Sequence, residues 1–291
     1  IYEPFAARSK VHTSGITRTM TIRKADFTLT EINDRLGVKI EVSYFGLPEM
    51  NMGALVREVN ITALKEALTF DLLDGMAAIL PSGVENGNYK EMSNLLKSWM
   101  EVENLHEQLP YFTLRASTGD TAEVSAFTKG HFVLSFSEEG KAILPIVDPS
   151  LVFGQNTALT FPDELPTMDF TSPIGTQVTV NQVPCAMTPA SVSLKGGETF
   201  RLHTVIGHVE DLSIIRQKRD LLTSHAFLDA KKAESATLVE DIVSDIETKT
   251  DEPLFDAYMK HCYLDNMLRG GYPIILKGYK RAFTYYIYSR K

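Results

Sequence analysis

The sequence predicts a mainly β fold, a large antiparallel β-sandwich that is followed by helices. Two observations carry this prediction. Between residues 17 and 206, short segments rich in Val, Ile, Thr, Phe and Tyr alternate with turn signals, and apolar residues recur at every second position. After His208 the charged residues become dense, and apolar residues recur at helical spacing instead. A sheet region that passes into helices is therefore expected.

The β region contains ten candidate strands. They are residues 17–22, 27–32, 38–45, 54–62, 69–73, 111–116, 123–128, 132–137, 177–180 and 198–206. This number is too large for a small barrel. Segments such as residues 39–42 alternate polar and apolar side chains, so each strand should have one buried and one wet face. The alternation favours two packed sheets.

Turn-forming residue pairs lie between these candidate strands. Glycine in such pairs can adopt the positive φ that tight hairpin turns require. The pairs are Leu36-Gly37, Asp74-Gly75, Gly119-Asp120, Lys129-Gly130, Glu139-Gly140 and Gly196-Gly197. Hairpin connections follow, so most strand pairs should be antiparallel.

One helix is expected to interrupt the β region at residues 89–103. Met92, Leu95, Leu96 and Trp99 recur there at helical spacing. A tryptophan on the apolar stripe of a helix belongs to the core more often than to a ligand site. We therefore expect Trp99 to pack in the core.

Further helices are expected in the charged C-terminal region. A helix pair should begin near Val209, and residues 235–248 carry an amphipathic pattern. Residues 253–267 should form another helix, because an acidic pair and a proline mark its start and a glycine pair followed by proline marks its end. Residues 274–276 and 281–288 are again expected to be extended.

Composition and charge exclude several classes of protein. Apolar residues make up 44% of the 291 residues, which is typical of a globular protein, and the net charge of −8 disfavours nucleic-acid binding. Only Cys185 and Cys262 occur, so we expect a reducing, cytoplasmic setting. The longest apolar stretches, such as residues 76–80, are too short to cross a bilayer, so no membrane association is expected.

Metal and cofactor signatures are missing from the sequence. The seven histidines form no H-x-x-x-H pair and have no cysteine pair nearby, so we expect no metal site. The sequence contains no Walker loop, no G-x-G-x-x-G fingerprint and no G-x-S-x-G elbow. We therefore expect neither a nucleotide cofactor nor serine-hydrolase chemistry.

Residues 263–273, YLDNMLRGGYP, form the most informative motif. One interpretation is structural: Gly270 and Gly271 cap a helix, and Asp265 and Arg269 form an i,i+4 ion pair. The other is functional. Asp265 lies near the negative end of the helix dipole, where a carboxylate is disfavoured, and the glycine pair would allow close approach of a sugar or phosphate. The residues by themselves leave both interpretations open.

This motif and its flanking segments resemble a known family of enzymes. LFDAY at residues 254–258, the motif itself and YSRK at residues 288–291 resemble the junction sequence of cellobiose-phosphorylase-like enzymes, most closely the long forms that resemble 1,2-β-oligoglucan phosphorylases. VREVNIT at residues 56–62 and DLLDG at residues 71–75 resemble that family's N-terminal sandwich. The resemblance spans nearly the whole chain.

The resemblance implies a domain layout and a reaction. Such enzymes have a galactose-mutarotase-like β-supersandwich, a helical linker, an (α/α)6 barrel with the catalytic aspartate and a small C-terminal β domain. Residues 1–207 would then be the supersandwich, residues 208–250 the linker and residues 251–291 the beginning of the barrel region. The parent would be a glycosyltransferase-class phosphorylase, which cleaves a β-linked glucose oligosaccharide with inorganic phosphate and inverts the anomeric centre.

The resemblance also sets the expected role of this chain. The general acid would lie downstream of residue 291, so no catalytic residue is assigned, and the chain by itself should show no turnover. Asp265, Asn266, Arg269 and Gly270 are the candidate substrate-binding residues. The chain would support the barrel, and carbohydrate contacts or homodimerisation stay open as further roles. The alternatives are a free-standing carbohydrate-binding module and a mutarotase-like epimerase.

Overall fold

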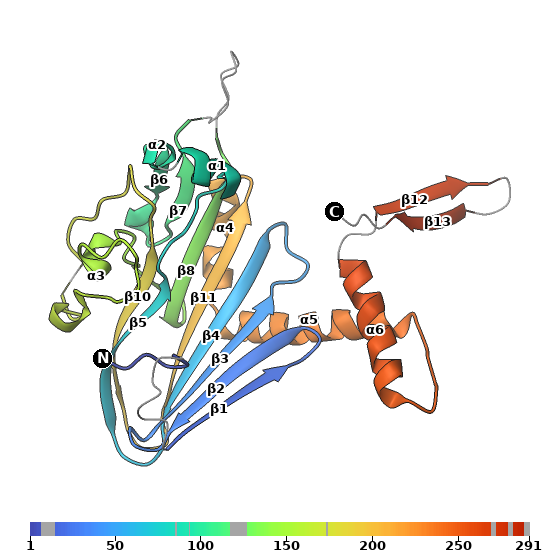
Figure 1. The fold of residues 1–291 in the computed structure, drawn as a ribbon, viewed down its shortest axis with the longest axis horizontal. Coiled ribbons are helices and arrows are strands. Elements are labelled where there is room, and N and C mark those ends of the chain that lie inside the picture. Colours follow the sequence, from blue (N-terminus) through green and yellow to red (C-terminus); the bar gives the residue numbers. More distant parts are fainter. Residues whose placement is uncertain are drawn as a thin grey trace.

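A computed structural model describes residues 1–6, 15–84, 86–92, 94–116, 127–172, 174–268, 272–278 and 282–287. A curved antiparallel sheet dominates it (Figure 1). Its strands are β1 (Ile16–Ile22), β2 (Asp26–Asn33), β3 (Val38–Gly46), β4 (Gly53–Ala63), β6 (Met100–Glu103), β7 (Tyr111–Leu114), β8 (Gly130–Glu138), β9 (Lys141–Ile143) and β11 (Thr199–Val209). The strand order is β1-β2-β3-β4-β11-β8-β7-β6, and β9 pairs with β8.

The two faces of this sheet are covered by different elements. Side chains alternate along each strand, so neighbouring residues of β4 point in opposite directions. Val56 packs in a buried cluster with Ile215 and Leu228 of the helices, whereas Val59 packs in another cluster with Leu72 of β5 (Leu68–Met76). We call these the helix face and the ribbon face.

The helix face is covered by α4 (Leu212–Leu222) and α5 (His225–Ser244). Each helix begins at a capping side chain: Asp211 accepts a hydrogen bond from the Ser213 amide, and Ser224 accepts one from the Phe227 amide. Buried side chains of both helices pack on central strands of the sheet. These side chains are Ile215, Leu222 and Leu228, and they contact a cluster that includes Phe45, Phe132 and Phe136.

The ribbon face is covered by a two-stranded sheet of β5 and β10 (Ala186–Leu194). The two strands pair antiparallel, from Ala186 opposite Met76 to Leu194 opposite Leu68. The loops around α3 (Ser150–Phe153) flank this ribbon (Figure 1). The predicted mainly β fold with a large antiparallel sheet is confirmed, and two sheets in separate layers are consistent with a sandwich.

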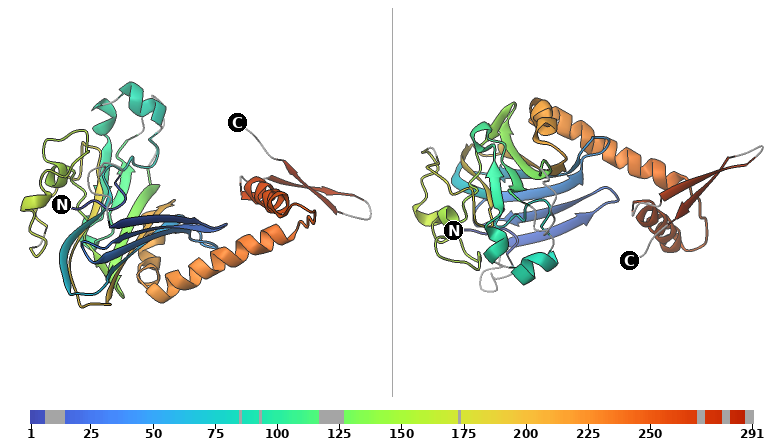
Figure 2. Two further views of the ribbon diagram at one scale, coloured as in Figure 1. Left: turned by 60° about the horizontal axis from the view of Figure 1, so that its bottom comes forward. Right: turned by 90° about the horizontal axis from the view of Figure 1, so that it is seen from above.

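The C-terminal elements extend away from the sheet. α5 projects beyond the edge of the sheet and leads to α6 (Pro253–Leu268), which is followed by the hairpin of β12 (Tyr272–Lys277) and β13 (Ala282–Ile287) (Figure 2). α6 packs on α5 through Leu264, which joins Val239 and Val243 in a buried cluster. Across the part of the chain that the structure describes, no helix is long and apolar enough to span a membrane.

Most of the predicted strands are confirmed, with three kinds of exception. Residues 177–180 form no strand, and Val180 makes only an isolated bridge to Glu101. Residues 123–126 lie outside the described part, so that prediction is largely untested. β6, β9 and β10 were not predicted. β10 contains Pro189, which argues against a central strand, but a two-stranded ribbon has a free edge where proline is tolerated.

The helix predicted at residues 89–103 is wrong in its second half. α1 (Asn86–Met92) and α2 (Asn94–Lys97) are helical, whereas residues 100–103 form β6 because Met100 and Val102 pair with β7 and are buried. Trp99 packs against the cluster of Leu96, Met100 and Leu114, in agreement with its predicted core role.

The C-terminal helices agree with the prediction in number, and α5 (His225–Ser244) differs from the predicted 235–248 at both ends. The helix pair begins at Leu212, close to the predicted start, and α6 matches the predicted helix 253–267. α5 begins ten residues before the predicted residue 235, because Ser224 caps it and Leu228 is anchored in the core. The extended segments expected after α6 are confirmed as β12 and β13.

One predicted turn is instead a strand. Gly75 lies inside β5, opposite Met187, with φ of 154°. A Cβ at this position would lie 2.0 Å from the carbonyl oxygen of Ala186, so only glycine allows the two strands to approach this closely. Gly37, Gly140 and Gly197 have positive φ in turns, as predicted. Gly130 begins β8, and the pair at residues 119–120 lies outside the described residues.

Gly75→Ala should therefore destabilise the protein by about 2 kcal/mol or more, because the methyl group collides with backbone that cannot move without breaking the ribbon. Urea unfolding followed by circular dichroism measures this loss. Gly46→Ala is the matched control, since a Cβ there meets nothing within 4 Å. Equal stability of the two variants would contradict the close approach.

Candidate functional site

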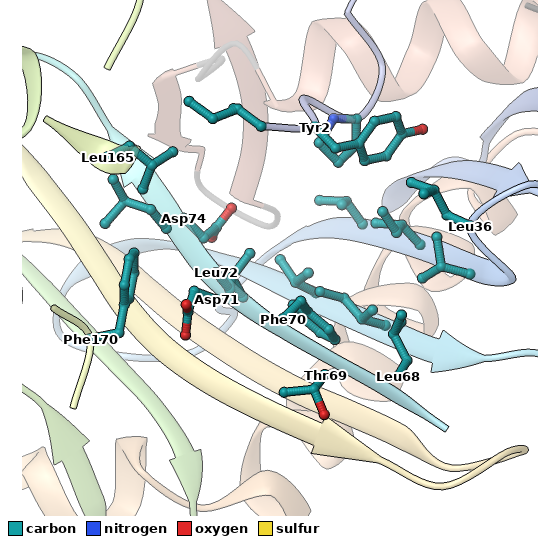
Figure 3. A pocket seen from close by; sticks show the side chains of 18 of the residues that line it. Tyr2, Leu36, Leu68, Thr69, Phe70, Asp71, Leu72, Asp74, Leu165 and Phe170 are labelled. Atoms are coloured by element: carbon teal, nitrogen blue, oxygen red, sulfur yellow. The ribbon is translucent and has the colours of Figure 1, made fainter. Parts of the chain in front are cut away.

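A cavity of about 560 Å³ lies on the ribbon face, between β5 and the central sheet (Figure 3). The sheet contributes Val38, Ile40, Val42, Val59 and Ile61, and β5 contributes Leu68, Phe70 and Leu72. Further lining comes from the N-terminal residues Ile1, Tyr2 and Phe5 and from Leu165, Met168 and Phe170, which follow α3 in the chain. The lining is therefore mostly aliphatic and aromatic.

The two walls of this cavity differ in exposure. The five sheet residues are between 2% and 6% exposed, because neighbouring strands and the N-terminal segment cover them. Leu68, Phe70 and Leu72 are only half-buried, although they point toward the sheet. The ribbon thus stands away from the sheet here, and its apolar side chains face space that no described side chain fills.

An ion pair bridges the two layers at one end of the cavity. Arg57 of β4 donates hydrogen bonds to both oxygens of Asp74 of β5, at 3.0 and 2.5 Å, and a third to the Tyr44 hydroxyl. Burial by itself would lower the pKa of Arg57, but the Asp74 carboxylate outweighs it and raises that pKa. Arg57 and Asp74 therefore neutralise each other, and they tie the ribbon to the sheet.

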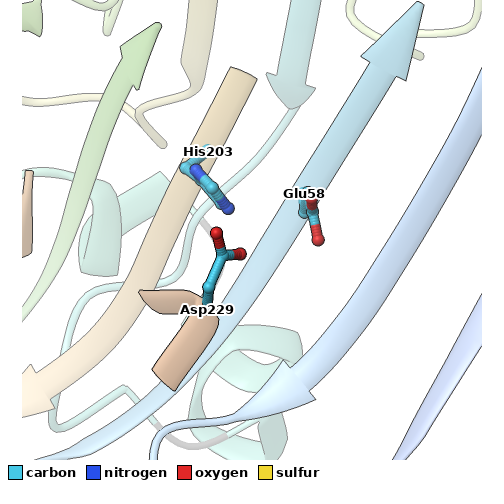
Figure 4. Close-up of side chains that lie close together, drawn as sticks. All are labelled: Glu58, His203 and Asp229. Carbon is cyan, nitrogen blue, oxygen red and sulfur yellow. The ribbon is translucent and has the colours of Figure 1, made fainter. Parts of the chain in front are cut away.

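A second cluster of charged groups lies under α5 on the helix face (Figure 4). Glu58 of β4 accepts hydrogen bonds from Arg201 of β11 and from Lys232 of α5, both at 2.9 Å. Arg201 also pairs with Asp229 of α5. Burial would raise the pKa of the Glu58 carboxyl, but Lys232, Asn60 and Arg201 outweigh it and lower the pKa to about 2.

His203 lies beside this cluster and is fully buried. Its Nδ1 lies 2.8 Å from Nδ1 of His225, whose Nε2 lies 3.2 Å from the carbonyl oxygen of Ser137. Because a carbonyl only accepts, His225 Nε2 donates, and in the neutral pair His203 Nδ1 must donate to His225 Nδ1. His203 Nε2 then keeps a lone pair, and it has no hydrogen-bond partner among the residues that the structure describes.

Glu58, His203 and Asp229 could in principle hold a metal ion, since their ligand atoms lie within 4.8 Å of one another. The charges argue against it. Arg201 and Lys232 already supply two positive charges to the two carboxylates. A divalent ion would either displace them or add two uncompensated charges to a largely buried cluster, which is costly. We therefore interpret the cluster as an ion-pair network that fastens α5 to the sheet.

A third group of residues places two imidazoles in one cleft. His131 of β8 and His208 of β11 are cross-strand partners, with ring centroids 5.1 Å apart. They line a cleft of about 490 Å³ with Leu55, Ile79 and Ile206. Burial, and secondarily the His208 charge, lowers the pKa of His131. Neither histidine was singled out from the sequence, because their proximity depends on the register of two strands far apart in the chain.

The motif residues occupy the end of α6. Asp265 and Asn266 lie in its last turn, and the Asn266 amide donates to the Cys262 carbonyl at 2.8 Å. Arg269 and Gly270 lie outside the described residues, so the predicted pair of Asp265 with Arg269 is untested. Earlier in the helix, Leu254, Phe255 and Tyr258 are 82%, 48% and 60% exposed and line a shallow hollow. We call these three residues the α6 face.

The position of His203 predicts how stability depends on pH. Burial, followed by the Arg201 charge, lowers the pKa of His203 to about 4 from an ordinary value near 6.5. Between these two pH values the unfolded chain binds a proton at this residue and the folded protein does not. Stability should therefore fall as pH decreases from 6.5 to 4. Urea unfolding at several pH values should show a smaller slope for His203→Gln than for the wild type.

His106→Gln is the control, because the His106 side chain is 78% exposed. This variant should keep the wild-type slope. A His203→Gln protein with the full wild-type slope between pH 6.5 and 4 would show that His203 is not the responsible group.

Comparison with protein-family models and with curated proteins identified no relative of this chain. No protein-family model matches this chain, and no curated protein is significantly similar to it. The relationship to cellobiose-phosphorylase-like enzymes therefore stays a prediction that rests on the motif at residues 263–273 and its flanking segments.

Proposed function

We propose that this chain is the non-catalytic N-terminal part of an inverting glycoside phosphorylase that acts on β-glucosides with inorganic phosphate. One observation carries the proposal. The segment with the strongest family resemblance coincides with α6, a helix that lies away from the sheet and exposes apolar side chains. In this proposal the α6 face contacts the catalytic barrel of the same polypeptide.

The packing of α6 supports this assignment. One side of the helix is anchored on α5 through Leu264, whereas the α6 face has no cover among the described residues. Burial of each large apolar side chain is worth about 1.5–3 kcal/mol. Three such side chains on two adjacent turns make a protein contact at this face favourable. A helix that only connected α5 to β12 would gain nothing from exposing these apolar side chains.

The proposed reaction needs little from this chain. In the family reaction one aspartic acid protonates the glycosidic oxygen while phosphate attacks the anomeric carbon, so the acid and the anion-binding groups belong to the barrel. Asp265 and Asn266 lie at the end of α6, where the chain would enter that barrel. Their proposed role is to line the edge of the sugar site, in a cytoplasmic enzyme.

The proposal predicts a difference between two lengths of the protein. The 291-residue chain, incubated with β-linked glucose oligomers and phosphate, should release no glucose 1-phosphate, because the general acid is outside it. The product of the natural reading frame continued beyond Lys291 should release it. Turnover by the shorter chain, or a stop codon directly after Lys291, would refute the proposal.

Substitutions in the α6 face test the proposed contact. Leu254→Ser and Tyr258→Ser should leave the stability of the 291-residue chain unchanged within about 0.5 kcal/mol, because both side chains are exposed there. In the extended protein each should destabilise the enzyme or lower its activity. Leu238→Ser, on the outer side of α5 and 37% exposed, is the matched control. Equal behaviour of all three variants in the extended protein would exclude the α6 face as the contact.

A second candidate function is aldose 1-epimerase activity, which the cleft of His131 and His208 favours. Mutarotation needs a general acid and a general base near the anomeric centre, and imidazoles can serve as both. The cleft contains no carboxylate among its described lining residues, so this candidate ranks second. Polarimetry on freshly dissolved glucose or galactose tests this candidate. Faster mutarotation that is lost in His131→Gln and His208→Gln would establish the epimerase, and an unchanged rate of mutarotation would exclude it.

A further inference from the structure

We propose that the ribbon-face cavity binds a small neutral amphiphile, a molecule with an apolar body and a hydroxyl head. The body would lie between β5 and the sheet, and the head would lie beside Asp74 (Figure 3), which is paired with Arg57. This inference does not depend on the proposed phosphorylase function, since it uses a different face of the molecule.

The walls of the cavity select an apolar body. Val42, Val59 and Ile61 form one wall, and Leu68 and Leu72 form part of the other. The β5 side chains are half-buried, so part of their apolar surface meets solvent although it points inward. Covering that surface gains about 25 cal/mol for each Å² removed from water. Water gains few hydrogen bonds between such walls, so an apolar ligand should displace it readily.

The size of the cavity suits a small molecule. A volume of about 560 Å³ falls in the range of small-molecule sites, which are about 300–1,000 Å³ and mostly apolar with a few polar groups. A protein side chain or two would not fill it. The cavity therefore has room for a chain-like or fused-ring compound.

The polar end selects the head group by charge. Arg57 is already neutralised by Asp74, and it also donates to the Tyr44 hydroxyl. A carboxylate head would lose its hydration here and would find no unpaired positive side chain among the described lining residues, whereas a hydroxyl can donate to an Asp74 oxygen. The site therefore favours an alcohol over a fatty acid.

The same distribution of polar groups disfavours a bare sugar. A pyranose carries hydroxyl groups around its whole ring, and each needs a hydrogen-bond partner when it is desolvated. Among the described lining residues, the charged side chains that face the cavity are Arg57 and Asp74, which are paired with each other. A glucose oligomer would leave several hydroxyls against Val and Leu side chains.

Binding can be measured with Nile red, a neutral dye whose fluorescence rises in apolar surroundings. The 291-residue chain should bind it saturably with one site. A long-chain alcohol should displace the dye about tenfold more tightly than the fatty acid of equal length, and cellobiose should not displace it. Lack of saturable binding, equal displacement by the alcohol and the acid, or displacement by cellobiose would each overturn the proposal.

Two variants locate the site and test the head-group argument. Leu72→Phe should fill part of the cavity and weaken dye binding about tenfold or more, whereas Leu238→Phe on α5 should not. Asp74→Asn keeps the size of the side chain but removes the charge that neutralises Arg57, so the fatty acid should bind several times more tightly while the alcohol changes little. Unchanged dye binding in Leu72→Phe places the dye elsewhere, and an unchanged preference for the alcohol in Asp74→Asn refutes the charge selection.

Discussion

The strict alternation of side chains along β4 and β11 is the constraint on which the rest of this structure depends. Glu58 and His203 are cross-strand partners and point to the helix face, and the next pair, Arg57 with Thr204, points to the ribbon face. A shift of the register by one residue would exchange every one of these side chains between the faces. The ion-pair network under α5 and the cavity under β5 would then both be lost.

Different contacts hold the covering layers on the two faces of the sheet. On the helix face, the network of Glu58, Arg201, Asp229 and Lys232 adds directional charge contacts to apolar packing, so α5 has one position on the sheet. On the ribbon face, apart from apolar packing, the ion pair of Arg57 with Asp74 ties β5 to the sheet, and the ribbon stands partly clear. The helix face thus holds α5, which leads to α6, and the ribbon face leaves a cavity.

The sequence predicted the regular elements well where the apolar period was long and unbroken. β3, β4 and α6 were found within a few residues, because their side chains alternate or repeat over several turns. β10 was missed because Pro189 interrupts the strand pattern, and the helix at residues 89–103 was extended too far because Met100 and Val102 fit both a helical stripe and a strand. Of the candidate site, only Asp265 and Asn266 could be placed; the cavity and the histidine pairs were not foreseen.

By itself, the sequence determined the mainly β class, the change to helices after His208 and the helix that carries the motif, since these follow from local periodicity and capping. Only the tertiary structure decided which residues meet. Arg57 and Asp74 lie 17 residues apart and Glu58 and Arg201 lie 143 apart, and their contacts depend on strand register and layer packing, which no local pattern encodes. The tertiary structure likewise decided that Gly75 permits a close strand approach instead of forming a turn.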